Sequence, residues 1–225
     1  MADSDNQVGA SAAKREQRVF DEHGGEYVLG AKLAKGGQGT VIRIKGNPHQ
    51  LIKVSNEPEG HPKTRAWQTQ LDRVRYLPIE DCGLPVAMPL AMIKKPRPGY
   101  VMELMDGLVP LEQLMLEFDK AMQEGRELEG FVSTGGLSRR LALLGRLARV
   151  LASLHALGIA HGDLSPKNVF VSNSHAHSQV WLIDADNLTY AVRDSSLQIY
   201  TPDYGAPELI RGDAGISTYT DIWSF

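Results

Sequence analysis

An acid and an amide lie five residues apart in the segment HGDLSPKN, residues 161–168. Asp163 can orient an attacking hydroxyl and accept its proton, and Asn168 can hold a magnesium ion. Sixteen residues further on, Asp184 ends the apolar run VWLI, where a carboxylate can bridge a metal ion to phosphates. An aspartate at the end of a strand is usually only a turn residue, but these three side chains together are suited to phosphoryl transfer.

A glycine-rich segment and a lysine precede these acids in the chain. Gly36, Gly37 and Gly39 fall in a predicted hairpin turn within LAKGGQGTV, and glycine is needed where backbone must approach phosphates closely. Lys53 lies within LIKV, on a predicted strand, where it could pair with an ATP phosphate. Each feature is commonly structural when it occurs alone. Their order ahead of the acidic motifs favours a shared site.

The elements that must position these residues fall into two groups. Between Glu26 and Val54, short β-favouring runs alternate with glycine and predict three antiparallel strands. A helix is predicted over residues 65–77, followed by strands in PVAMPLAMI and GYVMELM. The N-terminal half therefore reads as a five-stranded sheet with one helix.

The second group is mainly helical. Helices are predicted in PLEQLMLEFDKAMQEG and in LSRRLALLGRLARVLASLHALG, with Gly158 as the C-cap of the latter. In that helix one apolar face is expected to comprise Leu137, Leu141, Leu144, Ala148 and Leu151. Short strands follow in NVFVS and QVWLIDAD. We expect a flexible tail over residues 1–25, a sheet lobe over 26–106 and a helical lobe over 107–225, an α+β organisation.

Composition narrows the classes of partner and the cellular location. Lysine and arginine number 24 against 27 acidic residues, a net charge of −3, so no basic field attracts nucleic acid or an anionic membrane. The single cysteine, Cys82, fits a reducing cytoplasm. No secretory signal occurs in the first twenty residues. The most apolar stretch, 141–160, contains Arg146, Arg149 and His155, so no membrane span is expected.

In their order and spacing, these motifs resemble the eukaryotic-like serine/threonine protein kinase family, from about Tyr27 to Phe225. The segment YTPDYGAPE is similar to the family's substrate-docking loop, and DIWSF to the start of its central buried helix, with Asp221 bracing the catalytic loop. The pairing of HGDLSPKN with VWLIDADN suggests the divergent bacterial members. The resemblance implies a bilobal kinase fold whose C-lobe is incomplete, with later helices following Phe225.

The activity implied by the resemblance is that of a transferase. The chain would use ATP and Mg²⁺ to phosphorylate serine or threonine on a protein substrate. Thr201, in TPxYxAPE, is typical of serine/threonine kinases, in which this hydroxyl contacts the catalytic aspartate. Asp163 and Lys53 would be catalytic, and Asn168 and Asp184 would bind the metal ion.

The resemblance also implies the nucleotide site. Met102 would be the gatekeeper, residues 103–105 the hinge, and Leu51 one of the side chains that sandwich the adenine ring. Alanine occupies position 34, where the first glycine of the family's loop is usual. The nucleotide-binding residues are then Leu33, Ala34, Lys35, Gly36, Gly37, Gln38, Gly39, Val41, Lys53, Met102, Glu103, Met105, Phe170 and Ile183.

Several positions depart from the family's pattern. Gly162 replaces the usual arginine before the catalytic aspartate, Ser165 replaces a lysine, and Asp184-Ala185-Asp186 replaces Asp-Phe-Gly. Without that arginine to grip a phosphate, activity should not require phosphorylation between Asp186 and Thr201, where Ser195 and Ser196 lie.

The predicted helix over residues 65–77 lacks the glutamate that would pair with Lys53. Its available polar groups are Gln68, Gln70 and Asp72. This absence and the altered Asp-Phe-Gly motif motivate one alternative, a pseudokinase or nucleotide-binding scaffold, although all the catalytic and metal-binding side chains are intact. A second alternative is a small-molecule phosphotransferase of the aminoglycoside or choline type, motivated by HGD. Such enzymes normally lack the docking-loop and DIWSF segments.

Overall fold

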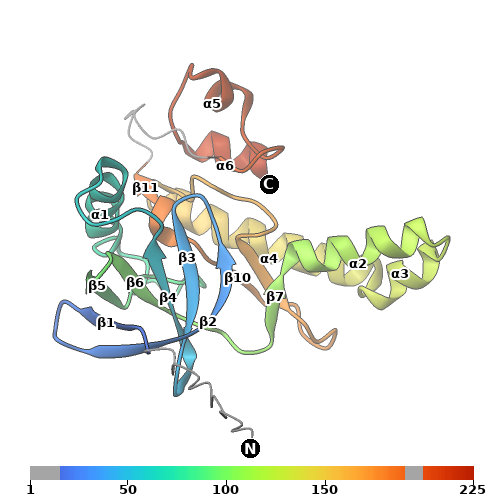
Figure 1. Cartoon of the computed structure of the whole chain (residues 1–225). Helices are drawn as coiled ribbons and strands as arrows, with labels where there is room; N and C mark the ends of the chain where they lie inside the picture. Colours follow the sequence, from blue (N-terminus) through green and yellow to red (C-terminus); the bar gives the residue numbers. More distant parts are fainter. Residues whose placement is uncertain (1–15, 191–199) are drawn as a thin grey trace, which may run out of the picture.

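The chain folds into two lobes, a barrel of strands and a group of helices (Figure 1). A computed structural model describes residues 16–190 and 200–225. The barrel ends with β6 (Gly99–Glu103), and the chain then enters the helical lobe through β7 (Leu108–Pro110). This confirms the predicted α+β organisation, a sheet lobe followed by a helical lobe. Ser195 and Ser196 lie outside the described residues.

The N-terminal lobe is a closed antiparallel barrel with the strand order β1-β2-β3-β4-β6-β5. The side chains of β3 alternate between the interior of the barrel and solvent, as a strand's geometry requires. Ile42 and Ile44 are buried, and Arg43 between them is exposed. Ile52 and Val101 complete the apolar interior. The strands are β1 (Arg18–Asp21), β2 (Glu26–Lys35), β3 (Gly39–Ile44), β4 (Asn47–Ser55), β5 (Ala91–Lys95) and β6 (Gly99–Glu103).

The prediction of a tail over residues 1–25 is wrong for β1, which pairs with both β2 and β5 and adds a sixth strand to the predicted five. Val19 is only 2% exposed and packs into the barrel core. The carboxylate of Asp21 stabilises the turn that follows by accepting a 2.7 Å hydrogen bond from the backbone N–H of Gly25. Residues 1–15 lie outside the described residues.

A single helix, α1 (Pro62–Val74), packs against the barrel. It begins three residues before the predicted helix, because Pro62 suits the first helical position. The predicted apolar stripe is correct, since Trp67, Leu71 and Val74 are all buried.

An ion pair ties the end of α1 to the barrel. Arg75 Nη1 donates a 2.8 Å hydrogen bond to Glu22 Oε2, in the turn between β1 and β2. This hydrogen bond, supported by the arginine charge, lowers the pKa of Glu22 despite its partial burial.

The helical lobe is built around α4 (Gly136–Ala156). Gly158, two residues beyond its last residue, caps the helix as predicted, with φ +72° and an N–H bonded to His155 O. The pair α2 and α3 extends to one side of the lobe (Figure 1). Among the described residues, no helix combines the length and apolar character that crossing a bilayer requires. The other elements are β7 (Leu108–Pro110), α2 (Leu111–Gln123), α3 (Glu127–Ser133), β8 (Ile159–Ala160), β9 (Val169–Ser172), β10 (Val180–Leu182), the 3₁₀ turn η1 (Ala185–Asn187), β11 (Thr189–Tyr190), α5 (Pro207–Arg211) and α6 (Thr218–Ser224).

The buried face of α4 differs from the predicted one. Leu137 and Leu141 are each 60% exposed, and Leu144 is also exposed. Of the predicted leucines only Leu151 lies in the core, together with Leu143, Leu147 and Leu154. The helix carries leucines in two overlapping helical registers, so periodicity alone did not distinguish the stripe that packs against β9 and β10.

Candidate active site

The glycine-rich turn between β2 and β3 lies against β4. Gly36 N–H bonds to Gly39 O at 2.9 Å, and the side chain of Asn56 donates a 2.8 Å hydrogen bond to Gly36 O. A Cβ at position 39 would lie 2.7 Å from Val54 O and 3.1 Å from Cγ of Lys53, so only glycine allows this approach. The turn is thereby held beside the strand lysine. Asn56, which the sequence analysis did not single out, contributes to this arrangement.

Lys53 is the buried cation of the site. It is 4% exposed on β4, between Val41 of β3 and Tyr100 of β6 in the sheet register. Its Nζ forms ion pairs with Asp184 and, at 2.9 Å, with Asp186 Oδ2. Burial alone would lower the pKa of Lys53, but the charges of these carboxylates outweigh it and raise the pKa.

Asp186 is the acid that sequence analysis did not assign. Its carboxylate is fully buried and accepts a 2.5 Å hydrogen bond from the indole Nε1 of Trp67, on the inner face of α1. Burial and the neighbouring charge of Asp184 raise the pKa of Asp186 above its usual range, against the opposing effect of Lys53.

The polar residues of α1 that sequence analysis left open as partners of Lys53 lie elsewhere. Gln70 donates instead to Leu188 O at 2.7 Å, and Asp72 is exposed. Two features of the sequence could have revealed the ion pair between Lys53 and Asp186. Aspartate replaces the motif's glycine at position 186, and α1 contains no glutamate.

The catalytic loop brings three predicted residues together. Thr201 Oγ1 donates a 2.8 Å hydrogen bond to Asp163 Oδ1, so the contact expected from the TPxYxAPE pattern is present. Asn168 Nδ2 bonds to Asp163 O at 2.8 Å and lies 3.4 Å from Asp163 Oδ2. These contacts fix the orientation of both side chains.

Asp221, in the first turn of α6, braces this loop. Its carboxylate is 1% exposed and accepts backbone N–H bonds from His161 at 2.7 Å and Gly162 at 2.9 Å. Gly162 has φ +84°, and a Cβ there would lie 2.8 Å from Asn187 O. Glycine is therefore required where the family usually has arginine.

The residues after β10 turn inward toward the barrel. Asp184 adopts φ +66°, a left-handed conformation uncommon outside glycine, and Ala185 after it is fully buried. His161 Nε2 lies 3.1 Å from Ile183 O and connects this turn to the catalytic loop. The turn is thus held where its aspartates reach Lys53.

The predicted nucleotide residues come from both lobes. Met102 is 3% exposed and pairs with Leu51 across β4 and β6, and the side chain of Gln38 donates to Asn187 Oδ1 at 3.1 Å, a contact between the lobes. The barrel supplies Leu33, Ala34, Lys35, Gly36, Gly37, Gln38, Gly39, Val41, Met102 and Glu103, followed by Met105, and the helical lobe supplies Phe170 on β9 and Ile183 after β10.

The donor atoms present fit a magnesium ion. Mg²⁺ is commonly bound by one or two carboxylates together with substrate phosphates. Asp184 offers a carboxylate whose side chain is 23% exposed. Asn168 uses its amide nitrogen to bond within the loop, which leaves its amide oxygen as a ligand.

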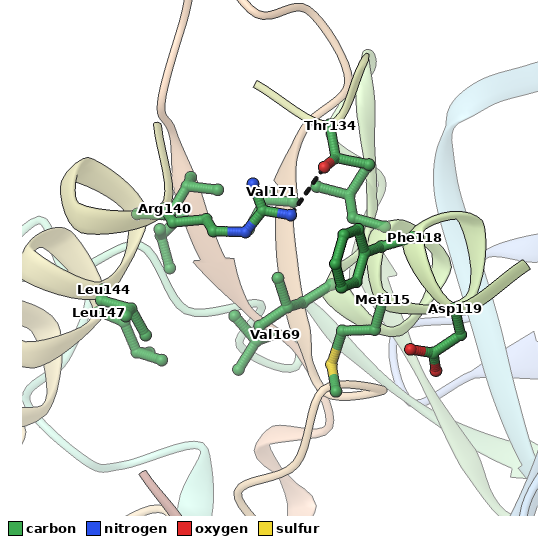
Figure 2. Close-up of a pocket in the computed structure, with 13 residues that line it drawn as sticks. Met115, Phe118, Asp119, Thr134, Arg140, Leu144, Leu147, Val169 and Val171 are labelled. Carbon is green, nitrogen blue, oxygen red and sulfur yellow. Dashed lines mark hydrogen bonds between the residues drawn. The ribbon is translucent and has the colours of Figure 1, made fainter. Parts of the chain in front are cut away.

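A separate apolar pocket of about 290 Å³ lies between α2, α4, β9 and β10 (Figure 2). Met115, Phe118 and Leu147 line it, and Arg140 at its edge donates a 2.8 Å hydrogen bond to Thr134 Oγ1. Its lining includes none of the predicted catalytic or metal-binding residues. The pocket is therefore distinct from the candidate active site.

A comparison of the chain with models of known protein families identifies the family to which it belongs. The family model described as "Protein kinase domain" matches residues 94–225, which include the catalytic loop, Asp184 and Asp221. The chain belongs to the protein kinase family. The glycine-rich turn and Lys53 of this kinase chain precede the matched residues.

Two curated relatives are similar to this kinase. The serine/threonine-protein kinase pkn2 of Myxococcus xanthus is 35% identical over 121 residues, covering 50% of this chain and 14% of the relative. CBL-interacting protein kinase 22 of Oryza sativa subsp. japonica is 25% identical over 222 residues, covering 89% of this chain and 46% of the relative. This kinase chain thus spans less than half the length of either relative.

A solved structure of the kinase domain of a Toxoplasma gondii specific rhoptry antigen has the same fold. The TM-score is 0.61 at 15% sequence identity, and the match covers 93% of this kinase chain and 67% of the other. At this identity the likeness supports the fold alone.

Proposed function

We propose that this chain is the catalytic domain of a serine/threonine protein kinase, which transfers the γ-phosphate of ATP to a hydroxyl of a protein substrate. The observation that carries the proposal is the 2.8 Å hydrogen bond from Thr201 Oγ1 to Asp163 Oδ1. It joins the segment that resembles a protein-docking loop directly to the candidate base. Small-molecule phosphotransferases normally lack that segment. The proposed domain comprises the predicted residues 26–225 extended at the N-terminal side to include β1 (Arg18–Asp21).

The roles of the side chains follow from their contacts. Thr201 donates to Oδ1 of Asp163 at 2.8 Å, whereas Asn168 makes only a long 3.4 Å contact with Oδ2. Oδ2 is therefore the oxygen that would orient the substrate hydroxyl and accept its proton. Lys53 lies beside the glycine-rich turn and is held by the carboxylates of Asp184 and Asp186, so it would place the phosphates. Asp184 and Asn168 would hold Mg²⁺, which when bound neutralises phosphate charge. Positioning and charge stabilisation supply most of the catalysis in such a site.

The proposal extends to the setting in which the enzyme works. The exposed Cys82 and an ATP-dependent reaction both suit a reducing, ATP-rich compartment, so we place the protein in the cytoplasm. With a net charge of −3, the chain has no basic field that would attract a nucleic-acid substrate.

The test is phosphate transfer from radiolabelled ATP with Mg²⁺, using full-length protein, a generic basic protein and a panel of small metabolites. We expect label on serine and threonine of the protein, and a loss of about 10²- to 10⁴-fold in Asp163→Ala. Asp119→Asn, at an exposed carboxylate on α2, is the matched control and should retain full activity. Label on metabolites alone would contradict the proposal.

A nucleotide-binding module without turnover is the second candidate. It is favoured by the ion pairs that engage Lys53 with Asp184 and Asp186, together with the lack of a carboxylate on the inner face of α1. In that case the wild-type protein would bind ATP and transfer no label to any acceptor, and Asp163→Ala would change nothing.

A further inference from the structure

The carboxylate of Asp186 has an environment that differs from that of Asp184, although both contact Lys53. Asp186 has no exposed side-chain surface, whereas the side chain of Asp184 is 23% exposed. Lys53 Nζ lies 2.9 Å from Oδ2 and 3.2 Å from Oδ1 of Asp186, so both oxygens are engaged. A buried carboxylate needs such partners, because removal from water is costly without them.

Trp67 supplies the remaining contact of this carboxylate. The indole is 7% exposed, donates its N–H to Asp186 Oδ2 at 2.5 Å and packs at a tilt against Tyr100, with ring centroids 6.0 Å apart. Trp67 lies on the buried face of α1, which it shares with Thr64, Gln70, Leu71 and Val74. That face carries no acid, so α1 reaches the lysine only through the indole and Asp186.

The two acids can therefore have separate tasks. In the proposed function Asp184 binds the metal ion, and this removes it as a dedicated partner of Lys53. Asp186 is buried behind the lysine and remains available to hold it. Further contacts tie the same turn to the barrel lobe, namely Gln70 to Leu188 O at 2.7 Å and Gln38 to Asn187 Oδ1 at 3.1 Å.

We infer that Asp186 is the positioning residue for Lys53 and that Trp67 anchors it to α1, so that an aspartate after β10 and an indole on α1 together replace the missing helix glutamate. This inference rests on the proposed function, in which Lys53 contacts the ATP phosphates. It makes the position of Lys53 depend on α1 and on the turn after β10 at the same time. Without Asp186, Lys53 would be left to Asp184 and would compete there with the metal ion.

The first test compares Asp186→Asn with Asp72→Asn in the full-length protein. The amide keeps the shape of Asp186 and an acceptor for Trp67 but removes the charge. Asp72 is an exposed acid on α1, the helix that carries Trp67. We expect kcat to fall about 10- to 100-fold in Asp186→Asn, as for loss of a charged hydrogen bond, with the KM for protein substrate unchanged. Asp72→Asn should match wild type.

The second test moves the carboxylate back to the helix. Asp186→Gly should lose activity, and Asp186→Gly combined with Trp67→Glu should recover at least about 10-fold over the single variant. A purely structural role for Asp186 would not produce this recovery. Trp67→Phe, which keeps a buried ring and loses the N–H, should lower kcat by about 3- to 10-fold.

Two results would overturn the inference. One is Asp186→Asn retaining kcat within twofold of wild type. The other is a double variant that melts like wild type but is no more active than Asp186→Gly. All rates are measured well below the melting temperature of the least stable variant. If Asp186→Asn does not fold, Trp67→Phe decides, and a wild-type kcat in that folded variant counts against the inference.

A binding measurement separates this inference from the proposed function. If the wild-type protein transfers no label at all, the proposed function fails, and the role of Asp186 is then judged from nucleotide affinity. We expect Asp186→Asn to reduce the preference for a non-hydrolysable ATP analogue with Mg²⁺ over adenosine by at least about threefold, because Lys53 is misplaced. An unchanged preference would refute the role of Asp186 independently of turnover.

Discussion

Replacing Asp221 with asparagine should loosen the catalytic loop by a predictable amount. Oδ1 of this carboxylate accepts the Gly162 N–H at 2.9 Å, and Oδ2 accepts the His161 N–H at 2.7 Å and lies 3.0 Å from His155 Nε2. Asparagine has only one side-chain oxygen. Its NH₂ group must therefore face one of the two buried backbone donors, and that hydrogen bond is lost.

The magnitude follows from the kind of bond removed. A hydrogen bond to a charged group contributes about 1.5–3 kcal/mol, so Asp221→Asn should lower the free energy of unfolding by about that amount. This is less than the roughly 5–15 kcal/mol that stabilises a domain, and the variant should remain folded. Because Asp163 directly follows Gly162, its displacement should also lower kcat by about 10- to 100-fold.

The assay is urea unfolding of the full-length protein with linear extrapolation, together with phosphate transfer on the same samples. Asp213→Asn is the control, because that side chain is 59% exposed in an ion pair with Arg211 and should cost less than about 0.5 kcal/mol. If Asp221→Asn behaves like this control in both measurements, the bracing role of Asp221 is wrong.

Three other predictions concern single sites. Gly162→Ala should cost about 1–3 kcal/mol in urea unfolding, because it combines a left-handed φ with a backbone contact, and it should cost more than Gly46→Ala, where φ is +77° and space is open. Glu22→Gln should be less stable than wild type at pH 7; because the pKa of Glu22 is lowered in the folded state, this gap should close as the pH falls below about 4. Replacing Ser195 and Ser196 together by alanine should leave kcat unchanged, since Gly162 cannot grip a phosphate, and a large loss rescued by acidic replacements would refute this.

The contacts of the catalytic loop could be predicted from the sequence because each is encoded by a short motif. The bond between Thr201 and Asp163 and the bracing by Asp221 were both expected from segments whose residues lie in a recognisable order. Gly158 was likewise predictable as a helix cap, since glycine readily adopts the left-handed conformation found there.

Two features of the fold could not be predicted from local pattern. The strand β1 has only four residues in a charged stretch, and its pairing with β5 depends on residues more than seventy positions away. In α4, leucines occur in two registers, and only packing against β9 and β10 selects the one containing Leu143 and Leu147. Propensity and periodicity describe an element but not its neighbours.

The partner of Lys53 escaped prediction for a related reason. The family's pattern places this partner on the helix, where a glutamate is usual and where this chain offers only Gln68, Gln70 and Asp72 as polar groups. The structure places Asp186, 133 residues from Lys53 in the chain, against the lysine, with Trp67 on the helix as its hydrogen-bond donor. The aspartate at position 186 and the missing helix glutamate were both visible in the sequence. That the one compensates for the other is seen only in the folded structure, where Asp186 contacts Lys53.

Closure of the barrel also limits how another protein can engage this lobe. Because β1 pairs with both β2 and β5, the strands described between residues 16 and 103 form a ring in which each strand has a neighbour on either side. Binding by strand addition requires a row of unpaired backbone N–H and C=O groups along a sheet edge. Regulators of the barrel lobe must therefore recognise its side chains or α1, and an inhibitor peptide designed to extend the sheet would have to displace β1 first.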